Sequence, residues 1–175
     1  MIGDAALWSR VAVAMVGGLA CLTDWRYRRI PNELTFGAAL AAFAFALTVG
    51  GPLALLTSMA GWVIGCLLFL PVFLLRGMGG GDVKLLAALG AWLGPGMVVW
   101  AALYAAVAGG VLAVLVTLHA GYLRTMFRNV WNLLMFWRVA GVQPHPELTL
   151  ATAAGPRLPY AFPITAGAVA ALWLR

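Results

Sequence analysis

Two long stretches without a charged side chain constrain the fold of this chain most. Neither Leu34–Leu75 nor Leu85–Leu123 contains Asp, Glu, Lys or Arg. A helix needs about 20 predominantly apolar residues to cross the hydrocarbon core of a bilayer, so each stretch is long enough for two crossings. Charged residues make up only 9% of the chain, whereas soluble domains contain about 25%. The sequence therefore predicts an integral membrane protein.

Glycine and proline divide both of these stretches. Gly50-Gly51-Pro52 interrupts the first stretch and Gly94-Pro95-Gly96 interrupts the second, and such clusters are typical of turns. A further apolar segment runs from Ala5 to about Thr23, and a last one from Leu158 to Leu174. We therefore expect an all-α polytopic protein with six transmembrane helices, in which residues 1–175 form a single domain.

The segment 122–139 has a different pattern. Arg124, Arg128 and Asn132 recur at a spacing of four, and apolar side chains occupy most of the other positions. This pattern is typical of an amphipathic helix that lies in the membrane interface. An ordinary extension of the preceding span beyond the membrane fits the pattern equally well.

The basic residues predict the orientation. Cytoplasmic loops of membrane proteins carry an excess of Lys and Arg. In the six-span arrangement most of the basic residues fall on one side: Arg26, Arg28, Arg29, Arg76, Lys84, Arg124, Arg128, Arg138 and Arg157. We assign this side to the cytoplasm, with both termini outside. The net charge of +6 is then a property of these loops, so nucleic acid is not an expected partner.

Two of the five acids are candidates for chemistry. Asp4 and Glu147 are expected in solvent, and Glu33 suits the start of a helix. Asp24 closes the first span and Asp82 opens the fourth, so both are predicted at the cytoplasmic margin, where they can meet. Each also has a structural alternative. Asp24 could pair with a nearby arginine, and Asp82 could cap the helix that follows.

A glycine-rich loop precedes Asp82. Gly77, Gly79, Gly80 and Gly81 lie within five residues. Glycine permits a close approach of another chain segment and also permits positive φ. We predict that this loop is an active-site loop that brings Asp82 to Asp24. Lys84 is a candidate contact for substrate or for Asp82, where its charge would favour the ionised carboxylate. Its alternative is to extend toward the lipid headgroups.

Two carboxyl groups that face each other share one proton across the working pH range. The ionised member can take a proton from an attacking water, and the protonated member can donate to a peptide carbonyl oxygen. This chemistry requires no covalent nucleophile, cofactor or metal. His119 and His145 are isolated, and Cys21 and Cys66 form no CxxC pair, so no metal site is predicted.

These residues resemble a known family. Gly79-Gly80-Gly81-Asp82 matches the GxGD signature of membrane aspartyl proteases, and Gly77–Leu86 is similar to the loop of type IV prepilin peptidases in particular. Asp24 to Asn32, with its basic loop and Ile-Pro-Asn ending, resembles the first half of their signature. Leu158–Pro163 is similar to the start of their last span. The resemblance extends from about Val11 onward.

The resemblance implies an aspartic endopeptidase of the bacterial inner membrane, with Asp24 and Asp82 as its catalytic pair. Such enzymes remove the short basic leader from prepilins and pseudopilins at the cytoplasmic face, after a glycine and before the hydrophobic pilin helix. Longer members add a cytoplasmic zinc-binding domain and methylate the new N-terminus. This sequence lacks the paired cysteines, so it resembles the short form that serves Flp-type pili or archaeal-like preflagellins, and N-methylation is in doubt.

Two other functions use the same residues differently. A proton- or cation-coupled transporter could use the acids as a relay, but most spans lack even Asn or Gln, and no internal repeat indicates one. A non-catalytic subunit of a secretion machine would tolerate Asp→Asn changes. The presenilin-like proteases carry a Pro-Ala-Leu motif near the C-terminus, and this sequence has none.

Overall fold

The computed structural model describes residues 2–149 and 159–174, and within them the chain forms five α-helices and no strand. The helices are α1 (Ile2–Tyr27), α2 (Asn32–Leu74), α3 (Gly80–His119), α4 (Leu123–Ala140) and α5 (Ala161–Leu174). The all-α class predicted from the sequence is confirmed. The start predicted for the last span, Leu158, lies outside the described residues, as does Arg157.

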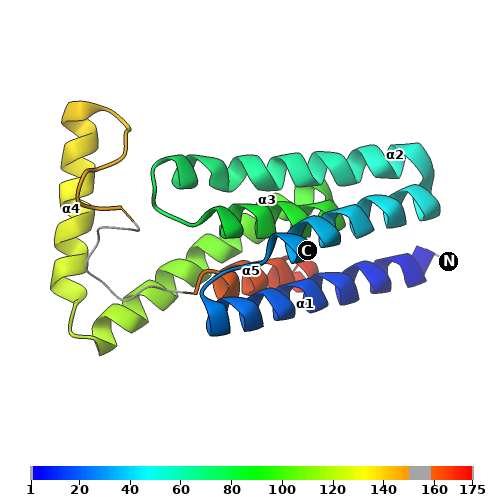
Figure 1. Ribbon diagram of the computed structural model, residues 1–175, viewed down its shortest axis with the longest axis horizontal. Coiled ribbons are helices and arrows are strands. Elements are labelled where there is room, and N and C mark those ends of the chain that lie inside the picture. The colour runs from blue at the N-terminus through cyan, green and yellow to red at the C-terminus, as the bar shows by residue number, and fades with distance from the viewer. Residues whose placement is uncertain (1, 150–158, 175) are drawn as a thin grey trace.

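Glycines divide α2 and α3 at the two predicted positions. Gly51 has φ 70° and ψ −164°, and Gly94 has φ 78° and ψ 173°. These values are not helical and are accessible almost only to glycine. Figure 1 shows α2 doubling back on itself at the Gly51 turn. Each long helix is therefore a pair of helical segments joined by a glycine.

The first half of α3 forms the centre of the bundle. Its side chains are almost completely excluded from solvent: Val83, Leu85, Leu86, Ala87, Ala88, Leu89 and Ala91 are all buried. From Gly80 to Leu93 this segment is about 21 Å long at 1.5 Å per residue, which is shorter than the hydrocarbon core of a bilayer. Because protein surrounds it, its length need not match the thickness of the lipid.

The last helix packs between α1 and the second half of α3 (Figure 1). Thr165 Oγ1 donates to the Gly17 carbonyl at 3.2 Å, which fixes α5 along α1. On the other side Gly167 meets the backbone of Ala101 and Ala105 so closely that a side chain would not fit. Small residues of this kind let membrane helices approach each other closely.

Three described helical segments are long and apolar enough to cross a membrane: Ala6–Tyr27, Asn32–Leu74 and Gly80–His119. The segment Ala161–Leu174 is apolar but shorter. These helices indicate a membrane protein. The first span was predicted to end at about Thr23 with Asp24 closing it, and the helix continues to Tyr27, so Asp24 lies in its last turn.

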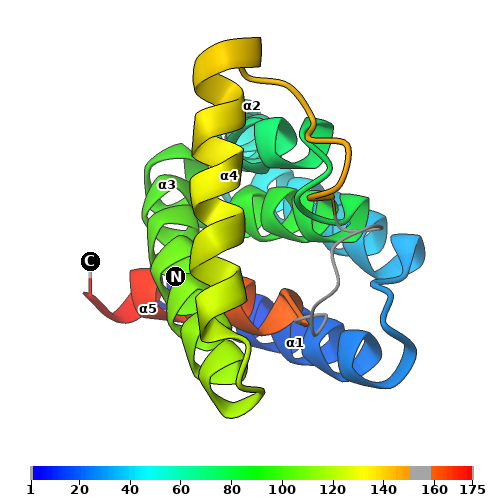
Figure 2. The same cartoon turned by 90° about the vertical axis from the view of Figure 1, so that its left-hand side faces the viewer.

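Helix α4 lies apart from the bundle. It crosses one end of the bundle, transverse to the other helices (Figure 2), and none of its residues is buried. Large apolar side chains remain exposed along it, including Phe127, Val130 and Leu134. The described part of the chain therefore leaves the apolar surface of this helix uncovered.

The turn at Gly51 leads to a testable prediction. We expect Gly51→Ala to lower the free energy of unfolding by about 1–3 kcal/mol, because alanine rarely adopts this backbone conformation. Gly37→Ala is the matched control, since Gly37 lies in the same helix, has no positive φ, and has open space where an added side-chain carbon would lie. Thermal unfolding of the purified protein in detergent measures both. Equal stability of the two variants would contradict the prediction.

Candidate active site

Asp24 and Asp82 line the same pocket. It has a volume of about 260 Å³, and its other lining residues are Arg28, Arg29, Ile30, Gly79 and Gly81. The two acids are 58 positions apart in the sequence (82 minus 24), and the folding of α2 and α3 brings them together. The predicted meeting of the two acids is therefore seen in the structure. Their catalytic role stays a prediction.

Asp24 lies where one helix ends and another begins. Its side chain is only 9% exposed, and its Oδ2 accepts a hydrogen bond from the Ala161 N–H at 3.3 Å. Helix α1 ends just beyond, because Arg28 adopts φ 53° and its N–H donates to the Asp24 carbonyl at 2.9 Å. The carboxylate of Asp24 therefore contacts the amino end of α5.

Asp82 lies in the first turn of α3. Its Oδ2 accepts from the Gly79 N–H at 3.2 Å, and its own N–H donates to the Gly79 carbonyl at 3.2 Å. This reciprocal pair is a capping arrangement that satisfies donors left without partners at the start of a helix. Asp82 is therefore not the N-cap residue anticipated as an alternative, because α3 begins at Gly80 and Gly79 is its N-cap. Its carboxylate supports that cap from the first turn and lines the pocket as well.

The glycines of this loop allow neighbouring atoms to lie close to the backbone, and none of them has positive φ. A side-chain carbon at Gly81 would lie 3.3 Å from Ile30 Cβ, and one at Gly79 would lie 3.3 Å from Asp82 Oδ2. None of the glycines from 77 to 81 has positive φ, and Gly80 and Gly81 already belong to α3. The left-handed conformation falls instead on Arg76, at φ 58°, just after α2 ends. Gly77 follows it, with its N–H donating to the Val72 carbonyl at 2.9 Å.

Lys84 connects α3 to the start of α2. Its Nζ donates to Asn32 Oδ1 at 2.9 Å and lies 5.5 Å from the centroid of the Phe36 ring. The residue that caps α2 is Pro31, so Asn32 is the first residue of the helix and its side chain serves this contact. In this structure Lys84 therefore holds two elements of the site together. Its contact with substrate stays a prediction.

Comparison with known protein families identifies the family to which this chain belongs. Residues 11–114 match the type IV leader peptidase family. This chain belongs to the type IV leader peptidase family. The matched segment contains both Asp24 and Asp82, and it includes the whole of the glycine loop. The resemblance stated from the sequence is confirmed, and the family supports a protease with leader-peptidase-like activity. No curated protein and no solved structure matches the chain.

The leader-peptidase match ends before α5, yet α5 contributes to the site. Besides the Ala161 N–H that contacts Asp24, the preceding Tyr160 is half-buried near Asp82. Burial raises the pKa of Tyr160, and the negative charge of Asp82 raises it further. Neither Tyr160 nor Ala161 belongs to the site that was predicted from the sequence. The one sequence feature that pointed to them is the segment Leu158–Pro163, which resembles the start of the family's last span.

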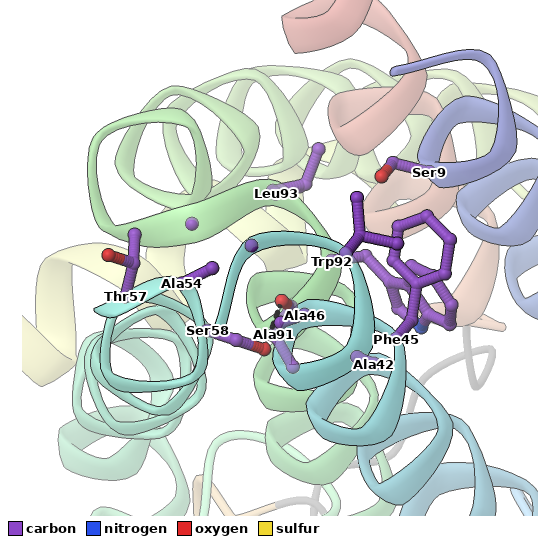
Figure 3. Close-up of a pocket in the computed structure, with 13 residues that line it drawn as sticks. Ser9, Ala42, Phe45, Ala46, Ala54, Thr57, Ser58, Ala91, Trp92 and Leu93 are labelled. Atoms are coloured by element: carbon purple, nitrogen blue, oxygen red, sulfur yellow. Dashed lines mark hydrogen bonds between the residues drawn. The ribbon is translucent and has the colours of Figure 1, made fainter. Parts of the chain in front are cut away.

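A second, larger cavity lies away from the two acids. Its volume is about 330 Å³, and Figure 3 shows it between α1, α2 and α3 near the turns at Gly50 and Gly94. No acid, base, histidine or cysteine is among its lining residues. The Ser58 hydroxyl within it already donates to the Ala91 carbonyl at 2.6 Å. This cavity therefore offers no ionisable side chain, whereas the two acids line the smaller pocket.

Proposed function

We propose that this protein is an aspartic endopeptidase that removes the leader peptide of type IV prepilins, with Asp24 and Asp82 as its catalytic pair. The observation that carries the proposal is that both carboxyls line one pocket, within the segment that matches the type IV leader peptidase family. Arg28 and Arg29 line the same pocket, and arginine donors can hold the backbone carbonyls of an extended peptide.

The mechanism uses one proton shared between two acids. Two carboxyls in one pocket cannot both ionise without a large electrostatic cost, so one stays protonated. The ionised carboxylate removes a proton from water as the water oxygen bonds to the scissile carbonyl carbon. The protonated carboxyl donates its proton to the carbonyl oxygen. Collapse of this gem-diol breaks the C–N bond: one of its hydroxyls returns a proton to the second carboxylate as the carbonyl re-forms, and the leaving amine takes a proton from the first carboxyl.

We place the site at the cytoplasmic face of the bacterial inner membrane. In this proposal α1 and α5 each cross the membrane once, and the breaks at Gly51 and Gly94 let α2 and α3 cross it twice each. Five basic residues at or beside the helix ends then lie at the end of the bundle that carries the two acids: Arg26, Arg28, Arg29, Arg76 and Lys84. An excess of basic residues is typical of the cytoplasmic side.

Helix α4 fits the headgroup region at this same end. It crosses the bundle end in Figures 1 and 2, so it would run along the membrane surface when the bundle spans the bilayer. Phe127, Val130 and Leu134 are exposed on its apolar face. Arg124 and Arg128 lie beside them and can reach anionic headgroups. The interfacial helix is therefore the alternative that we favour over an extension of α3.

We propose Flp-type prepilins as the substrates, because the chain resembles the short form of the family. The test is co-expression with an Flp-type prepilin in cells that lack their own prepilin peptidase. We expect the pilin to lose its basic leader after a glycine, and intact-mass spectrometry will show the new N-terminus and whether it carries a methyl group. A full-length prepilin in membranes that contain the wild-type protein would overturn the proposal for this substrate.

A further inference from the structure

The first turn of α5 is held in place from two sides. One turn along the helix, Thr165 Oγ1 bonds to the Gly17 carbonyl at 3.2 Å and accepts from Cys21 Sγ at 3.3 Å. Tyr160 faces α3, where a side-chain carbon at Gly109 would lie 3.5 Å from Tyr160 Cε1. The contact between Ala161 and Asp24 is therefore part of a fixed helix arrangement and does not depend on a loose loop end.

Two neighbouring residues of this turn serve the two acids. The Ala161 N–H donates to Asp24 Oδ2 at 3.3 Å, and both partners are buried. Tyr160, the residue before it, lies within electrostatic reach of Asp82. We propose that the first turn of α5 positions the catalytic pair, with the Ala161 N–H orienting Asp24. This inference rests on the proposed function and names a positioning residue for it.

A backbone amide suits this role for physical reasons. It cannot ionise and has no rotamers, so its direction is set by the helix alone. A hydrogen bond to a carboxylate favours the ionised form, and the start of α5 adds the partial positive charge of a helix N-terminus. Other titratable or charged groups face the pair as well, from α1, its following loop and α5: Cys21, Arg28, Arg29 and Tyr160.

Proline at position 161 removes this donor with little change to the helix. Ala161 is the first residue of α5, and proline is favoured at the first helical position because its missing N–H has no partner within the helix. Ala161→Gly is the matched control, because it also disturbs the packing of this buried methyl group but keeps the N–H. Both variants are compared with wild type in proteoliposomes, by the rate of prepilin cleavage across pH.

We expect Ala161→Pro to lower kcat about tenfold relative to Ala161→Gly, with KM unchanged, since the lost bond is to a charged group. Identical kcat values for the two variants would overturn the role of the Ala161 N–H.

Thr165→Val remains informative if Ala161→Pro does not fold, because it removes the hydrogen bond to the Gly17 carbonyl and keeps the N–H of Ala161. Thr165→Ser is its control, because it keeps the hydroxyl. We expect Thr165→Val to lower kcat several-fold relative to Thr165→Ser, because the first turn of α5 is then held less firmly against Asp24. Identical kcat values for the two variants would overturn the role of this turn.

A readout without substrate separates this inference from the proposed function. The chain has three aspartates, Asp4, Asp24 and Asp82, so isotope-labelled aspartate gives three carboxyl resonances by NMR. We expect the Asp24 carboxyl resonance to shift in Ala161→Pro and not in Ala161→Gly, whether or not a given prepilin is cleaved. An unshifted Asp24 resonance overturns the positioning role, whereas an uncleaved prepilin with wild-type protein overturns only the proposed substrate.

Discussion

Asp82→Asn and Asp24→Asn are each expected to reduce prepilin cleavage by at least about a thousandfold, the upper part of the range for loss of a general acid or base. Asparagine keeps a side-chain oxygen that can accept a hydrogen bond. It can therefore preserve the bond from the Gly79 N–H to position 82 and the bond from the Ala161 N–H to position 24. What it removes is the ability to gain or lose a proton.

Glu33→Gln is the control for this experiment. Glu33 is an exposed acid in the first turn of α2, and it does not line the pocket of the two aspartates. We expect wild-type cleavage from this variant. Cleavage rates are measured by mass spectrometry of the co-expressed prepilin, with the amount of each variant in the membrane determined in parallel. Normal cleavage by either Asp→Asn variant, at equal abundance, would refute the catalytic pair.

Gly61→Leu is expected to prevent folding, with a cost of about 3 kcal/mol or more, at or beyond the upper end for overpacking. In the contact between α2 and α3, a side-chain carbon at Gly61 would overlap the Gly90 carbonyl oxygen and lie 2.9 Å from Gly94 Cα. Gly65, one turn further along, would place such a carbon 2.7 Å from the Leu86 carbonyl oxygen. These neighbours are backbone atoms, so they cannot rotate away as a side chain could.

Gly110→Leu tests whether this effect is specific to the helix contact. Gly110 lies in the second half of α3 with no atom within 4 Å of the position of an added side-chain carbon. We expect this variant to accumulate and to melt close to wild type. Membrane abundance and thermal unfolding in detergent compare the two. A Gly61→Leu protein that melts like wild type would mean that α2 and α3 do not pack as described.

The features of the fold that could be predicted are those set by the distribution of charged residues and by the glycines at turns. The absence of charge from Leu34–Leu75 indicated membrane helices, and Gly51 and Gly94 marked the turns because few other residues adopt their backbone conformations. The central place of the first half of α3 could not be predicted. Apolar residues face either lipid or protein in a membrane, so hydrophobicity alone does not separate a buried helix from an exposed one.

Only the site residues that act through their side chains could be predicted from the sequence. Asp24 and Asp82 could be identified because a carboxylate beside an apolar span is energetically costly and usually has a function. The contact from Ala161 uses a backbone N–H, which every residue except proline has, so no sequence pattern reveals it. The positive φ of Arg76, beside a run of glycines that do not adopt it, was equally hidden. The glycines were correctly associated with close approach and incorrectly with positive φ.

The bond between Ala161 and Asp24 joins residues that are 137 positions apart, and this separation has a consequence for biosynthesis. A ribosome makes Asp24 early and Asp82 midway, but the turn that contacts Asp24 emerges only near the end of translation. A nascent chain that already contains both acids still lacks this turn. Completion of the site is thereby coupled to insertion of the last helix, so the order of synthesis itself delays proteolytic competence until the bundle is assembled.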